Sequence, residues 1–265
     1  GEADSRPEMS GPLADYIGLH RHAAAQASLI RNPAIAMRLM AAHARCGSSL
    51  WTVRLHSPGA VKEATLSSVE GGSAAAELIT AREGVETLFE ALGAPVPRRS
   101  GDAYHLCEMF AALLAMSDAE VMQVMALAMA ETLESGGAPV ETVLHACGTD
   151  AAEFWKPDEA FFELLRDKRV ITAFIADAVS PEAAREVGDA TAKAQKAQLA
   201  EALVARDTSV NSTWMPGWMQ VPPTRHIEGA ASPPADAWDR IAGLFEADLT
   251  EQSAAEPSNC EATAA

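Results

Sequence analysis

Apolar positions recur every three or four residues along most of this chain, which is the spacing of a helix with one buried face. The segment from Leu13 to Ile30 shows it first. Alternation with a period of two, the mark of a half-buried strand, is rare. The pattern predicts helices over residues 13–30, 34–45, 75–92, 104–116, 117–133, 139–146, 168–179 and 181–206.

Residues that favour helix ends support several of these boundaries. Asn32-Pro33 closes one helix and opens the next. Ser117 and Glu120 have the S-x-x-E spacing of a capping box, and Asp150 and Glu153 repeat that logic. Ser180-Pro181 supplies a capping hydroxyl followed by proline at the first helical position. The connections between the helices are therefore expected to be short.

Some segments do not fit a helix. Residues 49–56 alternate Trp51, Val53 and Leu55 on one face and form the single strand candidate, with no evident partner strand. Residues 67–73 are rich in Ser and Gly and predict a loop. Gly93, Pro95 and Pro97 interrupt the pattern, which suggests a subdivision near 93–103.

Composition favours the same fold class. Alanine is abundant and aromatic residues make up only 5% of the chain, so a large sheet core is disfavoured. We expect an all-α, irregular multi-helix bundle with at most one short strand or hairpin. Residues 1–10 are expected to be disordered, 11–225 to form the helical domain and 226–265 to be an acidic, mostly disordered tail. Within that tail, residues 236–249 have a helical pattern that is expected to fold on a partner.

No apolar run approaches the length needed to cross a bilayer, so we expect no membrane partner. The cysteines Cys46, Cys107, Cys147 and Cys260 are far apart and show no CxxC spacing. Reduced thiols in a cytoplasmic protein are the simplest interpretation.

The formal charge is −17, and it is unevenly distributed. Residues 107–165 contain eleven acidic residues and one basic residue, and residues 226–265 contain eight and one. Residues 166–225 are nearly neutral, with eight basic and seven acidic residues. Because DNA binding requires cations that displace counterions, this chain is not expected to hold DNA strongly by itself.

The sequence lacks the common signatures of enzyme chemistry. It has no HExxH, GxSxG, Walker or GxGxxG motif, so we expect no catalytic residue, no metal and no cofactor. The histidine and cysteine pairs are more consistent with packing than with a metal site; they are His20 with His22, His43 with Cys46, His105 with Cys107, and His145 with Cys147. Acidic residues such as Glu108, Glu120 and Glu131 are expected on solvated helix faces.

Two groups of residues are candidates for binding. A mildly basic group could contact DNA, although equal acid in the same stretch also fits an ordinary salt-bridged helix surface; its members are Arg166, Lys168, Arg169, Lys193 and Lys196. Trp214, Met215 and Trp218 are either a partner-binding edge or a segment that folds back onto the helical core.

An ordered set of residues runs through the second half of the chain. It comprises an Asp, paired aromatics and a Pro, a Lys-x-x-Ile helix, a Ser-x-Glu-Ala-Ala helix start, a Lys-containing helix and a closing Trp-Met-Pro; the positions are Asp150, Phe154, Trp155, Pro157, Lys168, Ile171, Ser180, Glu182, Ala183, Ala184, Lys193, Lys196, Trp214, Met215 and Pro216. This order resembles the C-terminal region of long ParB-like (ParB/RepB family) partition proteins of proteobacteria, where Leu usually replaces Met215. With similar features around Asn32-Pro33 and residues 110–129, the resemblance covers about residues 13–221.

The resemblance implies a chromosome- or plasmid-partition context. The family's nucleotide-handling domain and helix-turn-helix DNA reader would lie upstream, and no residue here matches them. We therefore expect a non-catalytic C-terminal assembly region that mediates self-association, as a possible homodimer, or contact with an unknown protein partner. DNA would be a partner of the full-length protein, which would be nucleoid- or plasmid-associated. The alternative is an independent acidic helical scaffold that binds a basic protein.

Overall fold

The computed structural model describes residues 7–46, 55, 59, 61–98, 103–207 and 214–245, and every regular element within these ranges is helical. The all-α prediction is thereby confirmed. The strand candidate at 49–56 lies, apart from Leu55, outside the described residues.

The elements follow one another with short connections. The α-helices are α1 (Gly11–Arg31), α2 (Pro33–Cys46), α3 (Glu63–Glu70), α4 (Ser73–Ala91), α5 (Ala103–Ala115), α6 (Asp118–Thr132), α7 (Gly137–Ala146), α8 (Glu159–Leu164), α9 (Lys168–Ala178), α10 (Pro181–Glu186), α11 (Ala192–Asp207) and α12 (Pro233–Asp239). Short 3₁₀ turns add η1 (Ala151–Glu153), η2 (Gly217–Met219) and η3 (Ala242–Leu244).

The predicted helix caps are largely confirmed. At the start of α6, Ser117 N donates to Glu120 Oε2 at 2.7 Å and Glu120 N donates to Ser117 Oγ, which completes the capping box. Ser180 caps α10 by accepting from Ala183 N at 3.2 Å. Asp150 caps η1, but Glu153 pairs with Arg31 rather than completing a second box.

Two expectations for local structure are wrong. Most of the predicted loop at 67–73 is helical. Ser67 and Ser68 belong to α3, which ends at Glu70, and α4 begins at Ser73. The predicted helix 181–206 is divided into α10 and α11. Gly188 lies in the break, and Thr191 Oγ1 accepts from Ala194 N at 3.2 Å, so a new capped helix starts there.

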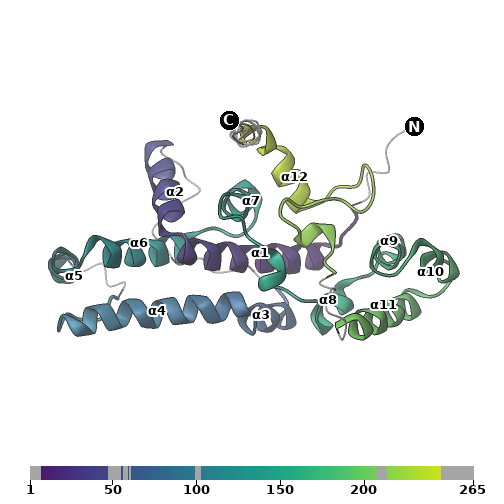
Figure 1. Cartoon of the computed structure of the whole chain (residues 1–265), viewed down its shortest axis with the longest axis horizontal. Helices are drawn as coiled ribbons and strands as arrows, with labels where there is room; N and C mark the ends of the chain where they lie inside the picture. Colours follow the sequence, from purple (N-terminus) through teal and green to yellow (C-terminus); the bar gives the residue numbers. More distant parts are fainter. Residues whose placement is uncertain are drawn as a thin grey trace, which may run out of the picture.

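Helix α1 runs through the middle of the molecule and is shared by two hydrophobic clusters (Figure 1). Its first half packs with α8, α9, α11 and η2, and its second half packs with α2, α4, α6 and α7. A third cluster joins α4 to α5 and α6 across the expected subdivision at 93–103. Figure 1 places α5 at one end of the long axis and α10 and α11 at the other.

The folded part is wider than the expected 11–225. Glu8 is buried and accepts hydrogen bonds from Trp218 Nε1 and from the backbone N–H groups of His226 and Ile227. Residues 226–245 pack on the body through α12, which lies against α7. Residues 8–10 and 226–245 therefore pack with the folded body, beyond the expected limits of 11 and 225.

None of the described helices has the length and apolar composition that crossing a bilayer requires.

Candidate functional site

A polar network that includes the buried Tyr16 and His20 and the half-buried Ser68 and Asp158 connects α1, α3 and the segment before α8. Tyr16 OH donates to Asp158 Oδ1 at 2.8 Å and accepts from Trp155 Nε1 at 3.1 Å. Ser68 donates its hydroxyl proton to Asp158 Oδ2, and His20 Nε2 lies 3.0 Å from Ser68 Oγ. Because the Ser68 hydroxyl donates its only proton to Asp158, the Ser68 oxygen accepts the hydrogen bond from His20 Nε2. The network therefore ties α1, α3 and the segment before α8 to one another.

Burial also keeps this histidine neutral. Desolvation lowers the pKa of His20 to about 4, because the imidazolium would lose its hydration there. Burial raises the pKa of Tyr16 well above its ordinary value. Both shifts favour the neutral form of the side chain, the imidazole of His20 and the phenol of Tyr16.

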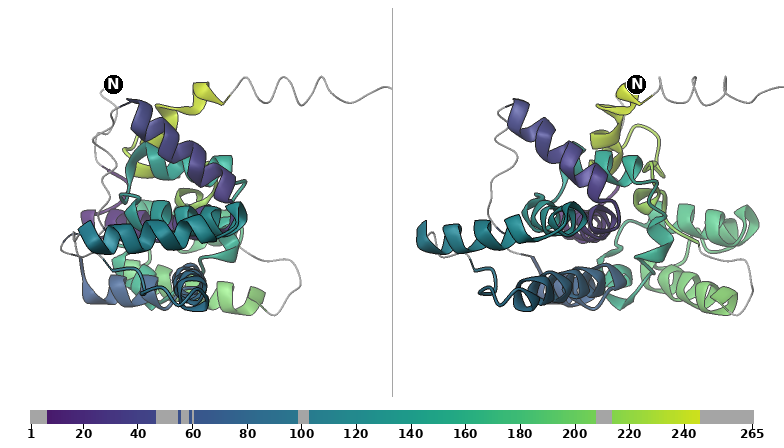
Figure 2. Two further views of the ribbon diagram at one scale, coloured as in Figure 1. Left: turned by 90° about the vertical axis from the view of Figure 1, so that its left-hand side faces the viewer. Right: turned by 60° about the vertical axis from the view of Figure 1, so that its left-hand side comes forward.

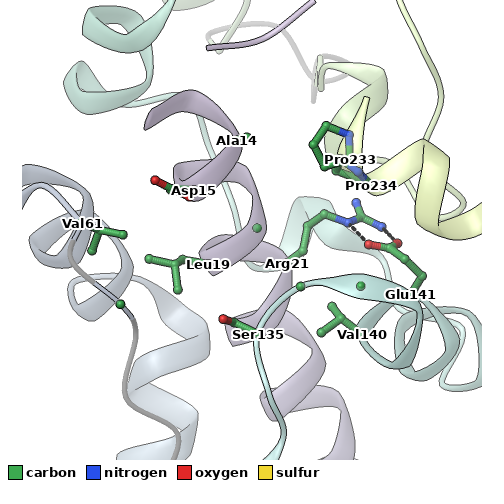
Figure 3. A pocket seen from close by; sticks show the side chains of 14 residues that line it. Ala14, Asp15, Leu19, Arg21, Val61, Ser135, Val140, Glu141, Pro233 and Pro234 are labelled. Carbon is green, nitrogen blue, oxygen red and sulfur yellow. Dashed lines mark hydrogen bonds and ion pairs between the residues drawn. The ribbon is translucent and has the colours of Figure 1, made fainter. Parts of the chain in front are cut away.

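A second buried pair joins α1, α7 and the segment around η2 (Figure 3). Arg21 and Glu141 expose only 2% and 4% of their side chains. Arg21 Nε donates to Glu141 Oε1 at 2.9 Å, and its Nη1 donates to the carbonyls of Trp218 and Gln220, each at 2.9 Å. Each charge is satisfied by interactions within the protein.

A cavity of about 550 Å³ borders this pair (Figure 3). Besides the pair, its lining has Asp15 and Ser135 as polar side chains, and the remainder is apolar or glycine. Glu141 is already paired with Arg21, and among the described residues no three His, Cys, Asp or Glu side chains gather here as metal ligands.

The described histidines and cysteines do not gather into a metal site. Across the described ranges, no three His, Cys, Asp or Glu side chains converge to hold a metal ion. His22 bonds the Leu133 carbonyl, His105 accepts from Arg98 N, and His226 accepts from Gly217 N at 2.7 Å. Their polar atoms stabilise local structure.

Two of the histidine–cysteine pairs remain, His43 with Cys46 and His145 with Cys147. The side chains of His43 and Cys46 lie outside the described residues. His145 packs against the rings of both Trp238 and Phe245, which also stack on each other. Burial raises the pKa of Cys147 to about 11, so its thiol is protonated.

The three predicted acidic residues have structural partners. Glu131 is largely buried and accepts from Arg82 Nε at 2.6 Å, so it is not on a freely solvated face. Hydrogen bonds from Ser117 lower the pKa of Glu120. Glu108 Oε2 lies 3.5 Å from His105 Nδ1.

The predicted basic residues lie on or beside α9 and α11, which pack together. Arg166, Lys168, Arg169 and Lys193 are exposed. Arg169 pairs with Asp167 at 2.9 Å. Lys196 is half-buried, and its Nζ donates to the Phe162 carbonyl at 2.9 Å.

The tryptophan segment folds back onto the core. Trp218 is fully buried and its ring meets Phe174 at 5.1 Å between centroids. Trp214 and Met215 are half-buried, and Trp214 Nε1 donates to Asp177 Oδ2 at 3.1 Å. Of the two interpretations left open, capping of the core holds, and Trp218 is not available at the surface for a partner.

Helix α5 has the surface that sequence reasoning missed. The helix itself was predicted, but four of its large apolar side chains, Tyr104, Leu106, Phe110 and Leu114, are 61–72% exposed. The opposite side packs on α4 and α6 and is formed by Met109, Ala112 and Leu113. Every exposed residue of α5 is uncharged; they are Ala103, Tyr104, Leu106, Cys107, Phe110, Ala111, Leu114 and Ala115.

The position of α5 makes this surface accessible. Figure 1 shows α5 end-on at the left-hand edge, and the left view of Figure 2 shows it lying across the front of that end. An exposed apolar surface of this kind makes α5 a candidate contact site. The available sequence signal was that Glu108 is the single charged residue of α5, whereas a surface helix has a polar face.

In comparisons with known proteins, no family model, no curated protein and no solved structure matches this chain.

Proposed function

We propose that this chain is the C-terminal assembly region of a ParB-like DNA-binding partition protein. It acts without catalysis, through self-association or contact with a protein partner. The observation that carries the assembly role is the uncharged, exposed face of α5, centred on Phe110. Contact surfaces are depleted of charge at their centre and enriched in aromatic side chains, which this face reproduces.

The structural roles of the residues behind the resemblance support the family proposal. Trp155, Ile171 and Ala184 belong to one hydrophobic cluster. Trp214 and Met215 pack against the same cluster. If two proteins share one structural module, the residues that build its core are expected to occur in the same order in both. The proposal needs no catalytic residue.

The proposal includes at most weak DNA contact by this region. Lys196 and Arg169 already have partners within the protein, which leaves Arg166, Lys168 and Lys193; the test uses Lys168 and Lys193. If α9 and α11 touch DNA, a mobility shift at about 50 mM salt weakens as salt rises and is lost in Lys168→Glu with Lys193→Glu. The absence of a shift at that salt removes direct DNA contact from the proposal.

Self-association is tested on the unmodified chain. Light scattering at about 50 µM protein is expected to give a molar mass at least twice that of one chain. A monomer at that concentration would contradict self-association.

The charge of the neighbouring helices favours a second candidate, an acidic scaffold that binds a basic protein. Together α4, α5 and α6 carry eight acidic residues and one basic residue. This candidate predicts a monomer that captures a basic amphipathic helix and releases it at high salt, because screening weakens such attraction.

A further inference from the structure

We infer that the cavity beside Arg21 and Glu141 binds a small organic cation, a molecule with one ammonium group on a compact apolar body. The cavity is separate from the α5 face, so this inference goes beyond the proposed assembly role and does not depend on it. The size of the cavity, a part of its wall without side chains and the charge of its lining support the inference.

The first feature is the size and position of the cavity. Its lining comes from α1, from the start of α7 with the turn before it, from the segment before α3 and from the start of α12 (Figure 3). Protein interiors leave few voids larger than a water molecule, whereas this space measures about 550 Å³. Sites for small molecules measure about 300–1,000 Å³ and occur between packed helices. The space is therefore large enough for a compact organic molecule.

The second feature is a glycine in the wall. Gly18 lies inside α1, where glycine is less favourable for a helix than alanine. A Cβ atom on Gly18 would meet nothing within 4 Å beyond its chain neighbours and the backbone of its own helix, so packing does not require glycine there. Gly18 shares a helix face with Asp15 and Arg21, and all three line the cavity. A side chain at position 18 would therefore enter the cavity, and glycine keeps the space open.

The third feature is the charge of the lining. Arg21 and Glu141 neutralise each other, and Arg21 Nη1 also donates to two backbone carbonyls. The Asp15 side chain is exposed, and within the described part of the chain no ion pair or hydrogen bond engages its carboxylate. An ammonium group would complement this charge. An anion would be repelled both by Asp15 and by the net charge of −17.

The apolar part of the lining fits the body of such a cation. Leu19, Val140 and Pro234 are buried in the fold and also border the cavity. An apolar body that covers these side chains removes hydrocarbon surface from water, which favours binding. Apolar contact therefore supplies most of the affinity, and Asp15 selects the charge.

Phenethylamine is a suitable probe, because it has one ammonium group on a compact aromatic body. Titration into the unmodified full chain, followed by NMR, is expected to give a Kd below about 1 mM. Phenethyl alcohol and hydrocinnamate keep the ring but lack the ammonium, and each is expected to bind at least threefold more weakly. Methylammonium lacks the apolar body and is expected not to bind. Absence of phenethylamine binding, or equal binding of methylammonium, would overturn the inference.

Gly18→Leu tests the location of the site. Leucine would occupy the cavity, so the affinity for phenethylamine is expected to fall at least tenfold. The matched control is Gly84→Leu, because Gly84 lies inside α4, outside the lining, and a Cβ atom there also meets nothing within 4 Å. Both variants replace a helical glycine and are expected to keep their thermal stability. Equal affinity of the two variants would place binding elsewhere and reject the site.

Asp15→Asn tests the charge without adding volume. It is expected to lower the affinity for phenethylamine about threefold, as for an exposed ion pair, and to leave the affinity for phenethyl alcohol unchanged. The control is Glu83→Gln, which removes an exposed carboxylate of α4 outside the lining. Equal losses in both variants would mean that only the overall charge attracts the amine, which contradicts the inference.

The outcomes separate this inference from the proposed function. If the chain is a monomer that binds phenethylamine at this cavity, self-association is rejected and the ligand site stands. If the chain self-associates but does not bind phenethylamine, the ligand site is rejected and the assembly role stands.

Discussion

At the scale of residues, the buried titratable side chains of this protein serve its structure. Arg21, Glu141, His20 and Asp158 each bond to groups from distant segments, and each such contact ties a helix to another part of the fold. Sequence reasoning found none of these pairs, because they join residues more than forty positions apart and depend on how the helices pack.

Glu141→Gln is predicted to reduce the free energy of unfolding by about 3–5 kcal/mol, because it leaves the buried Arg21 guanidinium without its counter-charge. Chemical denaturation measures this. The matched control is Glu182→Gln, which removes the exposed partner of Arg185 and should cost less than about 1 kcal/mol. Similar losses of unfolding free energy in both variants would show that the buried pair contributes no more to stability than the exposed pair.

The buried histidines predict a loss of stability in acid. Burial lowers the pKa of both His20 and His226 in the folded state, so the unfolded chain binds more protons. The contribution of neutral His20 to the free energy of unfolding is fully present above its unfolded pKa of about 6.5, and it is lost as the pH drops toward about 4. Denaturation at several pH values should show a shallower loss for His20→Asn. An unchanged slope would refute the contribution of His20.

At the scale of elements, local signals predicted helices well and packing poorly. The Ser117 capping box and the Ser180 cap depend on neighbouring residues and are present as expected. The exposed stripe of α5 was not predicted, because periodicity shows that side chains share a face but not whether another element covers that face. The burial of Trp218 likewise depends on α9, some forty residues earlier in the chain.

Ser117→Ala is predicted to destabilise the protein by about 1 kcal/mol through loss of the α6 cap. Thermal unfolding followed by circular dichroism measures it. Ser67→Ala, at an exposed position inside α3, is the control and should change stability by less than about 0.5 kcal/mol. An effect of Ser117→Ala no larger than that of the control would mean that the capping box is not stabilising.

At the scale of the whole molecule, the helices that build the two hydrophobic clusters around α1 are distinct from α5, which exposes apolar side chains. Helix α1 joins two hydrophobic clusters at the centre, the tryptophan segment closes one of them, and α5 lies uncovered at one end (Figure 1). The net charge of −17 keeps copies apart in general, so a specific contact requires a face without charge. Among the described helices, α5 provides such a face.

The most direct test of this account is the molar mass of Phe110→Glu measured beside Ile79→Glu, each at about 50 µM and with its helix content checked by circular dichroism. Both substitutions place a carboxylate on an exposed apolar position, one on α5 and one on α4. The account predicts that Ile79→Glu remains a dimer like the unmodified chain, whereas Phe110→Glu is a folded monomer. A folded Phe110→Glu variant that remains a dimer would contradict the account.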